Sequence, residues 1–435
     1  MNPQRSNLRK YIIPSMVSNA AFFVLTIADG MFVGNGVGTD ALGAVSLAMP
    51  YVMLIGAVSV LFTIGGVAVT AIRLGRGDQP GANQAFMHAF AAVTAVFAAV
   101  TVAGTTLSGQ IATILGANDT YHQMVSDYIF WYSIFAVPAG LFTCLANFCR
   151  NDGDPKRSTA AALVCTAANI FGDWLLVYPL QKGIAGAALA TGASQVLAVI
   201  VLLTHFTQKK GVLRIRKFTV SLPLYRKILL RGLPEMVSQF GAPITTYSMN
   251  RVLTGIGDAY VNAYAVIGYA GSLFASLMYG LSGGLQPLYG QSYGAKDDHG
   301  LRYYLKSGLT MSVLGGLALF GLTFFIGRPV CTIFGADAAA VNIVVQALPK
   351  YCLNFVFAAT SAVLASYLFS TKRTQYAIPL NVCRSVVLNF CCINFLPLLF
   401  GTQFVWYSVA VAEAICLGIA VVLWRVSERR GIVYH

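Results

Sequence analysis

The sequence predicts an all-α integral membrane protein with about twelve transmembrane helices in two six-helix lobes, related by a pseudo-two-fold axis along the membrane normal. Of its 435 residues, 57% are hydrophobic and only 10% are charged, which is outside the range of soluble domains. Apolar stretches of about 20 residues, enough to cross a bilayer as a helix, follow one another along nearly the whole chain. Little of the chain is left for a soluble domain.

The predicted membrane segments are separated by short polar intervals, with one exception. Their approximate cores are residues 11–36, 42–70, 85–107, 122–146, 159–180, 184–206, 228–253, 259–285, 303–327, 341–370, 375–399 and 403–425. The longest polar interval, residues 207–226, is basic and contains Pro223, which is typical of a linker. We therefore expect an N-terminal lobe over residues 1–206, a cytoplasmic linker over 207–226 and a C-terminal lobe over 227–435.

An internal repeat supports the two-lobe organisation. Residues 113–117 (TILGA) recur as residues 332–336 (TIFGA). The offset spans an even number of helices, so both copies have the same orientation in the membrane, as expected for an axis along the membrane normal. The same alignment places Asn250 opposite Asp29, so only the first copy keeps an acid at that position.

The basic residues are concentrated on one side of the membrane. The net charge of +14 would suit a nucleic-acid ligand, but most of the 29 Lys and Arg fall in the intervals that share one side with the N-terminus. The positive-inside rule then places both termini in the cytoplasm. We expect a multi-pass monomer that contacts membrane lipids and no nucleic acid. The nine cysteines lack paired metal-type spacing, so we interpret them as small hydrophobic residues.

Two aspartates, Asp29 and Asp173, lie deep inside apolar segments, where a carboxylate is costly unless it is protonated, paired or hydrated. With a rise of about 1.5 Å per residue, Asp29, Asp173 and Thr191 all lie about 10 Å below the outer surface. Asn169 shares one helix face with Asp173. Two carboxyl groups in a poorly hydrated site cannot readily both ionise, so this cluster could load and release a proton, or its oxygens could coordinate Na⁺. The alternative is that the acids only link helices by hydrogen bonds.

Other polar residues in the apolar segments have both structural and functional interpretations. Arg384 and Glu413 both fall near mid-membrane and predict a structural ion pair, because either charge alone would be costly. Pro14 should kink the first helix, as a packing irregularity or as a conformational hinge. The candidate substrate contacts are Tyr128, Tyr132, Gln239, Tyr247, Asn250 and Met278. Such side chains are also typical of helix packing, and the first two of an interfacial aromatic belt.

Five segments together resemble the multidrug and toxic compound extrusion (MATE) family, over nearly the whole chain. They are residues 28–34 (ADGMFVG), 153–156 (GDPK), 183–191 (GIAGAALAT), 286–290 (QPLYG) and 293–296 (YGAK). The resemblance is closest to the prokaryotic DinF-like branch. It implies a protein of the cell inner membrane that exchanges H⁺, the preferred ion, or Na⁺ for organic, often cationic or amphiphilic compounds. By the same resemblance, Asp29, Asn169, Asp173 and Thr191 couple the cation and Pro14 is the bending proline.

Two other classes of protein are alternatives to this transporter. A lipid-linked oligosaccharide flippase of the same superfamily should line its cavity with several bases for pyrophosphate, whereas the bases within helices reduce to Arg384 and Arg231. An integral membrane transferase would need clustered Asp or His at one membrane face, and the five histidines are scattered. No phosphate-binding P-loop is present. We therefore expect no enzyme activity and no cofactor, with H⁺ or Na⁺ as coupling ion and small organic compounds as substrates.

Overall fold

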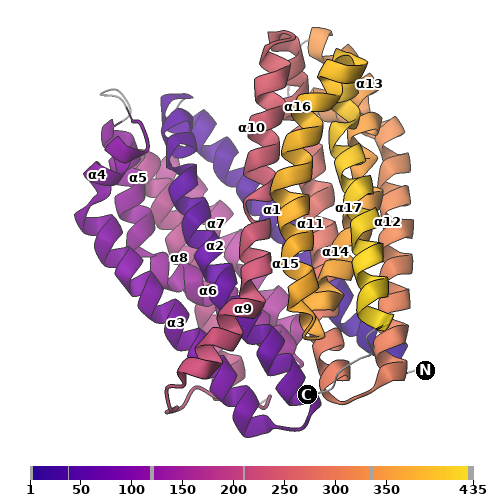
Figure 1. Ribbon diagram of the computed structural model, residues 1–435. Helices are drawn as coiled ribbons and strands as arrows, with labels where there is room; N and C mark the ends of the chain where they lie inside the picture. Colours follow the sequence, from indigo (N-terminus) through magenta and orange to yellow (C-terminus); the bar gives the residue numbers. More distant parts are fainter. Residues whose placement is uncertain (1–2, 38, 118–121, 209–210, 334–337, 430–435) are drawn as a thin grey trace. The chain divides into compact units, whose positions relative to one another are not determined.

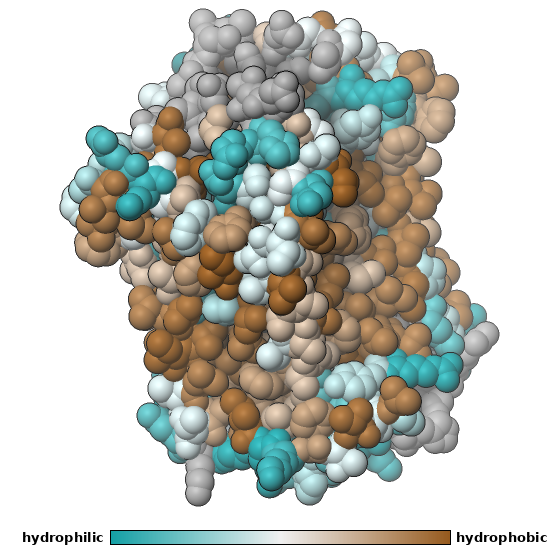
Figure 2. Space-filling view, turned by 90° about the vertical axis from the view of Figure 1, so that its left-hand side faces the viewer, coloured by the Kyte–Doolittle hydropathy of each residue, from teal (hydrophilic) through white to brown (hydrophobic). Residues whose placement is uncertain are grey.

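The computed structural model describes residues 3–37, 39–117, 122–208, 211–333 and 338–429, and nearly all of these lie in helices, with no strand among them (Figure 1). Ten described helices are long and apolar enough to cross a membrane. The pair α5 (His122–Ile134) and α6 (Ala136–Asn151), bent by 52°, could form an eleventh span. On the face in Figure 2, hydrophobic side chains cover the middle and hydrophilic ones gather toward the upper and lower ends. The prediction of an all-α membrane protein is confirmed.

The predicted segment over residues 228–253 is helical but interrupted. It forms the end of α9 (Leu222–Ser238) and most of α10 (Gly241–Thr254), which are separated by a turn at residues 239–240. Neither piece is among the ten candidate spans. Of the repeated sequence segments, residues 334–336 lie outside the described part of the chain.

Contacts between residues divide the chain into two compact units. The N-terminal unit comprises residues 17–232, and the C-terminal unit comprises residues 1–16 together with 233–435. The chain therefore passes between units twice, once inside α1 (Pro3–Gly36) and once inside α9. Each crossing lies within two residues of a proline inside the helix, Pro14 in α1 and Pro234 in α9. Residues 3–16, which the sequence analysis places in the N-terminal lobe, belong to the C-terminal unit.

The N-terminal unit is a helical bundle around a core rich in phenylalanine. Its further helices are α2 (Thr39–Gly75), α3 (Gln79–Thr106), α4 (Ser108–Ile114), α7 (Pro155–Val177) and α8 (Gly183–Thr207). Local signals fix two of the helix starts. Asp78 accepts a hydrogen bond from the backbone N–H of Gly81 (2.9 Å), and Asp154 accepts one from that of Arg157 (3.2 Å). A proline follows each cap within the first turn, where its missing N–H is not needed.

The C-terminal unit is also helical, with long spans and one irregular stretch. Its elements after α10 are α11 (Asp258–Gly294), α12 (Asp298–Ile333), α13 (Ala338–Cys352), α14 (Asn354–Ser370), α15 (Thr374–Val382), η1 (Cys383–Leu388), α16 (Asn389–Phe400), η2 (Thr402–Phe404) and α17 (Val405–Arg429). The element η1 is a π-helical turn between α15 and α16. Asn7 of α1 donates a hydrogen bond to the Tyr304 hydroxyl of α12 (3.4 Å), which ties the start of the chain to this unit.

Glycines allow close helix crossings in both units. In the N-terminal unit, a Cβ built on Gly65 of α2 would lie 2.1 Å from the carbonyl oxygen of Ile228 in α9. In the C-terminal unit, a Cβ on Gly280 of α11 would lie 2.5 Å from the Cα of Met16 in α1. Only glycine permits backbones to approach this closely. The first part of α9 and the first part of α1 are each held against a glycine of a long neighbouring helix.

Candidate functional sites

The helix pair α7 and α8 positions the centre of the predicted cation cluster. Asp173 and Asn169 are both fully buried and lie one turn apart on α7. The Asn169 side-chain amide donates to the Thr191 hydroxyl of α8 (3.2 Å), and that hydroxyl donates to the carbonyl of Ala187 (3.1 Å). The orientation of the Asn169 amide is therefore set by α8, with its oxygen left as an acceptor.

Asp29 of α1 completes this cluster. Its side chain is partly buried, and it interacts electrostatically with Asp173. Tyr128 of α5 interacts with both acids. The structure thus brings Asp29, Asn169, Asp173 and Thr191 into one neighbourhood within the N-terminal unit, as the helix depths predict.

The carboxyl and amide oxygens of the cluster have few protein partners. Both carboxyl oxygens of Asp173, Oδ1 of Asn169 and Oδ1 of Asp29 are buried without a hydrogen-bond donor among the described residues. Buried polar atoms are nearly always bonded, and exceptions tend to mark functional positions. Four acceptor oxygens without donors are suited to binding a proton or a hard cation, both of which supply positive charge.

Of the tyrosines predicted to contact substrate, Tyr128 lies beside the acids and Tyr132 lies next to Tyr128. The rings of Tyr128 and Tyr132 stack with centroids 6.0 Å apart and an interplanar angle of 19°. Ser133, which follows Tyr132 on α5, has its hydroxyl 2.7 Å from that of Tyr51 on α2, and the two are hydrogen-bonded. The aromatic face next to Asp29 and Asp173 is thus held by α5 and α2, elements of the same unit.

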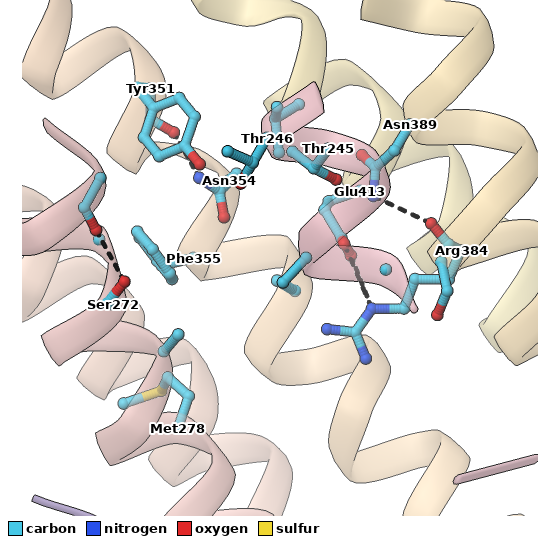
Figure 3. A pocket seen from close by; sticks show the side chains of 18 of the residues that line it. Thr245, Thr246, Ser272, Met278, Tyr351, Asn354, Phe355, Arg384, Asn389 and Glu413 are labelled. Carbon is cyan, nitrogen blue, oxygen red and sulfur yellow. Dashed lines mark hydrogen bonds and ion pairs between the residues drawn. The ribbon is translucent and has the colours of Figure 1, made fainter. Parts of the chain in front are cut away.

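A second site, the C-terminal cavity, lies wholly within the C-terminal unit (Figure 3). Its volume of about 490 Å³ is within the usual range for small-molecule pockets. Of the residues predicted to contact substrate, Asn250 and Met278 line it. Gln239, in the turn after α9, is exposed, and Tyr247 is 65% exposed; neither lines this cavity.

One wall of the C-terminal cavity carries an ion pair. The Nε of Arg384 donates to both carboxylate oxygens of Glu413, each at 3.2 Å, and the Ser361 hydroxyl donates to Oε2 (3.4 Å). Glu413 is 5% exposed, so its charge needs a partner inside the membrane. The similar membrane depth of Arg384 and Glu413 predicts their pairing, and the structure places them in contact. Their position on the cavity wall was not predicted.

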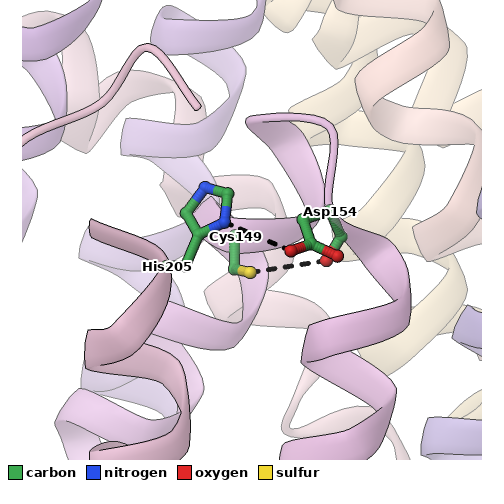
Figure 4. A group of neighbouring side chains, drawn as sticks. All are labelled: Cys149, Asp154 and His205. Carbon is green, nitrogen blue, oxygen red and sulfur yellow. Dashed lines mark hydrogen bonds and ion pairs between the residues drawn. The ribbon is translucent and has the colours of Figure 1, made fainter. Parts of the chain in front are cut away.

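A third polar group lies where α6, α7 and α8 meet. This His205 cluster comprises Cys149, Asp152, Asp154, Arg157 and His205, of which Figure 4 shows Cys149, Asp154 and His205. His205 is 1% exposed, and its ring nitrogens lie 2.9 Å from Asp152 Oδ2 and 3.4 Å from Asp154 Oδ2. Asp152 also accepts the backbone N–H groups of Val212 (2.9 Å) and Leu213 (3.1 Å). The cluster therefore anchors the segment after α8 to the loop between α6 and α7.

Three members of the His205 cluster, Cys149, Asp154 and His205, are of types that bind metal ions, and their ligand atoms lie within 4.8 Å of one another. Each already has a protein partner. The Cys149 thiol donates to the Asp154 carbonyl (3.4 Å), and Arg157 pairs with the Asp154 carboxylate (3.2 Å). Each ring nitrogen of His205 lies within hydrogen-bond distance of an aspartate oxygen, so neither nitrogen is left open for a metal. We interpret the cluster as a structural anchor.

Replacing His205 with alanine should destabilise the protein by about 3 kcal/mol, because it removes a buried side chain and leaves the buried Asp152 carboxylate without its side-chain hydrogen-bond partner. Thermal unfolding of the purified protein in detergent measures the effect. The matched control is His299→Ala, since His299 is exposed and its ring hydrogen-bonds to the Gln4 side chain (3.1 Å) rather than to a buried acid. Unfolding temperatures that fall equally in the two variants would contradict the anchor role.

Several site residues were missed by the sequence interpretation. Asn354 and Asn389 line the C-terminal cavity and are buried. Each is a polar residue within an apolar segment, a feature of the sequence that could have identified them as site residues. Asp152 and Asp154 form a D-x-D pair after α6, but nothing in their spacing pointed to His205, which lies 53 residues beyond Asp152. The members of that cluster come together through the packing of α6, α7 and α8.

The sequence resembles known proteins over most of its length. The family model described as MatE matches residues 14–175 and 234–393. A multidrug export protein MepA of Staphylococcus saprophyticus is 23% identical over 421 residues, covering 93% of this chain and 90% of the relative. A protein of the same name from Staphylococcus aureus (strain NCTC 8325 / PS 47) is 22% identical over 419 residues, covering 95% and 92%.

Solved structures share the fold of this chain. A crystal structure of MATE in complex with MaL6 superposes with a TM-score of 0.92 at 20% identity, covering 98% of this chain and 96% of that one. An outward-facing multidrug resistance MATE family transporter of the MOP superfamily gives a TM-score of 0.91 at 20% identity, with the same coverage. At this identity the likeness concerns the fold alone.

Proposed function

Because the chain belongs to the MatE family, we propose that it is a cation-coupled antiporter that exports organic, often cationic or amphiphilic compounds by alternating access. Multidrug export is the activity in the names of its full-length relatives. The observation that carries the coupling proposal is Asp173, which is fully buried and has two carboxyl oxygens without a donor among the described residues. The exchanged cation would bind there and at Asp29, Asn169 and Thr191.

We prefer H⁺ as the coupling ion for a reason of hydrogen bonding. A proton on Asp173 converts one acceptor into a donor in a cluster that has four acceptor oxygens and no donor for them among the described residues. Na⁺ is the alternative, since oxygen atoms of carboxyl, amide and hydroxyl groups are ligands for hard cations. A gradient of either ion could drive export of the substrate. When the exchange carries one net charge inward through 100 mV, that movement is worth about 2.3 kcal/mol, or roughly a fifty-fold concentration ratio.

The proposal includes the location and membrane topology of the protein. We place it in the cell inner membrane as a multi-pass monomer with both termini in the cytoplasm, as the distribution of Lys and Arg indicates. Its role is transport rather than catalysis. The flippase alternative gains no support from the C-terminal cavity, because Arg384 is the one basic residue among the described residues that line it. Pyrophosphate would be expected to require several bases.

Reconstituted protein should take up an organic cation when the only driving force is a pH gradient that releases H⁺ from the vesicle lumen. The measurement is the initial rate of fluorescent dye uptake into proteoliposomes, with empty liposomes as background. A Na⁺ gradient of equal size at uniform pH serves as the second arm and should give background rates. Transport driven by Na⁺ alone would overturn the preference for protons, and transport driven by neither gradient would overturn coupling.

A further inference from the structure

The segment that joins α8 to α9 is fixed along the N-terminal unit. Its described part, residues 211–221, forms no helix. The side-chain oxygen of Asn83 on α3 accepts a hydrogen bond from the backbone N–H of Arg214 (2.6 Å). Further along the same helix, the His88 ring accepts one from the backbone N–H of Ser221 (2.9 Å), and both acceptors are buried. The side chains between Arg214 and Ser221 are therefore presented in one arrangement, because the backbone is held at both ends.

The His88 ring also holds this segment beside the start of α9. Its centroid lies 4.9 Å from that of Phe218 in the segment and 4.8 Å from that of Tyr225 in α9. Leu224 and Ile228 of α9 are buried in a small core with residues of α2 and α3. The joining segment and the first turns of α9 therefore lie side by side on the N-terminal unit.

Basic and aliphatic side chains cover the outer side of this region. The exposed ones, which we call the basic–apolar surface, are Ile215, Arg216, Lys217, Val220, Leu222, Arg226, Lys227, Leu229 and Leu230. Val220 is 67% exposed and Leu222 is 78% exposed. Aliphatic side chains grouped and exposed in this way mark a surface that contacts a partner or a membrane.

The charge of the basic–apolar surface is not balanced by acids of the protein. No Asp or Glu occurs in the sequence between Asp173 and Glu235, an interval that holds nine Lys and Arg. The four bases of the surface form no ion pair with an acid among the described residues. Asp152, which binds the joining segment, has a side chain only 1% exposed and is paired with His205. The surface therefore needs a partner that carries both negative charge and hydrocarbon.

An anionic phospholipid meets both requirements. Its phosphate accepts charge-assisted hydrogen bonds from Lys and Arg, and its acyl chains can cover aliphatic side chains at the membrane boundary. A soluble anion would leave those side chains in water, and hydrocarbon alone would leave the charges unpaired. The long stems of Lys and Arg also let a charged group reach the phosphate while the stem lies along apolar surface. In a chain with ten candidate membrane spans, lipids are the neighbours at hand.

We infer that the basic–apolar surface selectively binds anionic phospholipids of the leaflet that it faces, with the phosphate held by its four bases and the acyl chains packed against its five aliphatic side chains. Because the joining segment is already fixed by buried hydrogen bonds, little conformational entropy is lost on binding. Such binding requires no ion gradient and is independent of the transport proposed above.

Two lipids with the same acyl chains test the inference. Phosphatidylglycerol is anionic, and phosphatidylcholine has no net charge. Native mass spectrometry of the purified full-length protein gives a dissociation constant for the first molecule of each lipid that binds. Phosphatidylglycerol should bind about tenfold more tightly, the effect expected when one or two bases contact a net negative charge. Equal affinities, or tighter binding of phosphatidylcholine, would overturn the inference.

Removing the charges of the surface locates the preference. The combined variant carries Arg216→Gln, Lys217→Gln, Arg226→Gln and Lys227→Gln. Its two dissociation constants should agree within about twofold. The matched control replaces four exposed bases of the C-terminal unit, which the positive-inside rule places on the same membrane side, and should keep the tenfold ratio. These are Arg5, Arg9, Arg302 and Lys306, each replaced with glutamine.

A ratio that survives in the combined variant, or that is lost equally in the control, would refute the inference. If the combined variant does not fold, Arg226→Gln with Lys227→Gln should lower the ratio by at least about threefold. An unchanged ratio in that double variant would again refute it.

A soluble headgroup distinguishes a lipid from a free anion as the ligand. Glycerol phosphate carries a phosphate without acyl chains, so it cannot cover the aliphatic side chains. A large excess should leave the dissociation constant for phosphatidylglycerol within about twofold of its value without competitor. Complete displacement of the lipid would show that the surface binds free phosphate groups and would overturn the assignment to phospholipids.

Discussion

Replacing Asp173 with asparagine is expected to reduce gradient-driven export to the background of empty proteoliposomes, a loss of at least about tenfold. The side chain is fully buried on α7, and asparagine has nearly the same size, so the packing against α8 should persist. The amide cannot take up or release a proton, and it offers Na⁺ no negative charge. Exchange of substrate for substrate across the vesicle membrane, which needs no coupling ion, should continue.

The control for this experiment is Asp127→Asn. Asp127 lies in the same unit, on α5, and accepts a hydrogen bond from Gln123 of the same helix (2.8 Å). Its hydrogen bond stays within α5 and joins no member of the cluster, so gradient-driven export should stay within about twofold of the unaltered protein. Wild-type rates in Asp173→Asn, or an equal loss in both variants, would remove the case for Asp173 as the coupling acid.

The second large effect is expected on stability. Replacing Gly65 with alanine should destabilise the N-terminal unit by about 3 kcal/mol, because the added Cβ would overlap backbone atoms that cannot rotate away. That Cβ would lie 2.1 Å from the Ile228 carbonyl oxygen and 2.9 Å from the Gly232 nitrogen. α2 and α9 would have to move apart. The measurement is thermal unfolding of purified variants in detergent, followed by tryptophan fluorescence.

Gly56→Ala is the matched control, because Gly56 lies in the same helix and a Cβ there meets no atom within 4 Å. Alanine favours helix over glycine by up to about 1 kcal/mol, so this variant should be as stable as the unaltered protein or slightly more stable. Equal unfolding temperatures for the two variants would show that the α2–α9 crossing contributes nothing to stability.

Much of the fold follows from local properties of the chain. Long apolar runs predict membrane helices, and the constant rise of a helix converts sequence position into depth. Depth in the membrane alone predicts the pairing of Arg384 with Glu413 and the proximity of Asp29 to Asp173. The break between α9 and α10 is harder to see, because Pro234 and Pro243 are both tolerated within helices and only the turn between them interrupts the span.

The C-terminal cavity and the His205 cluster could not be predicted from sequence for a different reason. Residues of α10, α11, α14, η1 and α17 line the cavity, so its shape depends on how these elements pack. The π-helical turn that exposes Arg384 has no signature in the sequence. Likewise, His205 meets Asp152 only because α8 returns alongside α6 and α7. Such neighbours become visible only in three dimensions.

The two crossings of the chain between units also restrict how the protein can move. The N-terminal unit is joined covalently to the C-terminal unit at two positions, next to Pro14 in α1 and next to Pro234 in α9. A proline lacks the N–H of an internal helix hydrogen bond, so bending is easiest at these positions. A rigid body attached at two flexible points keeps a single free rotation, about the line through those points. The covalent connections alone therefore favour a rotation with one degree of freedom over independent sliding or twisting of the units.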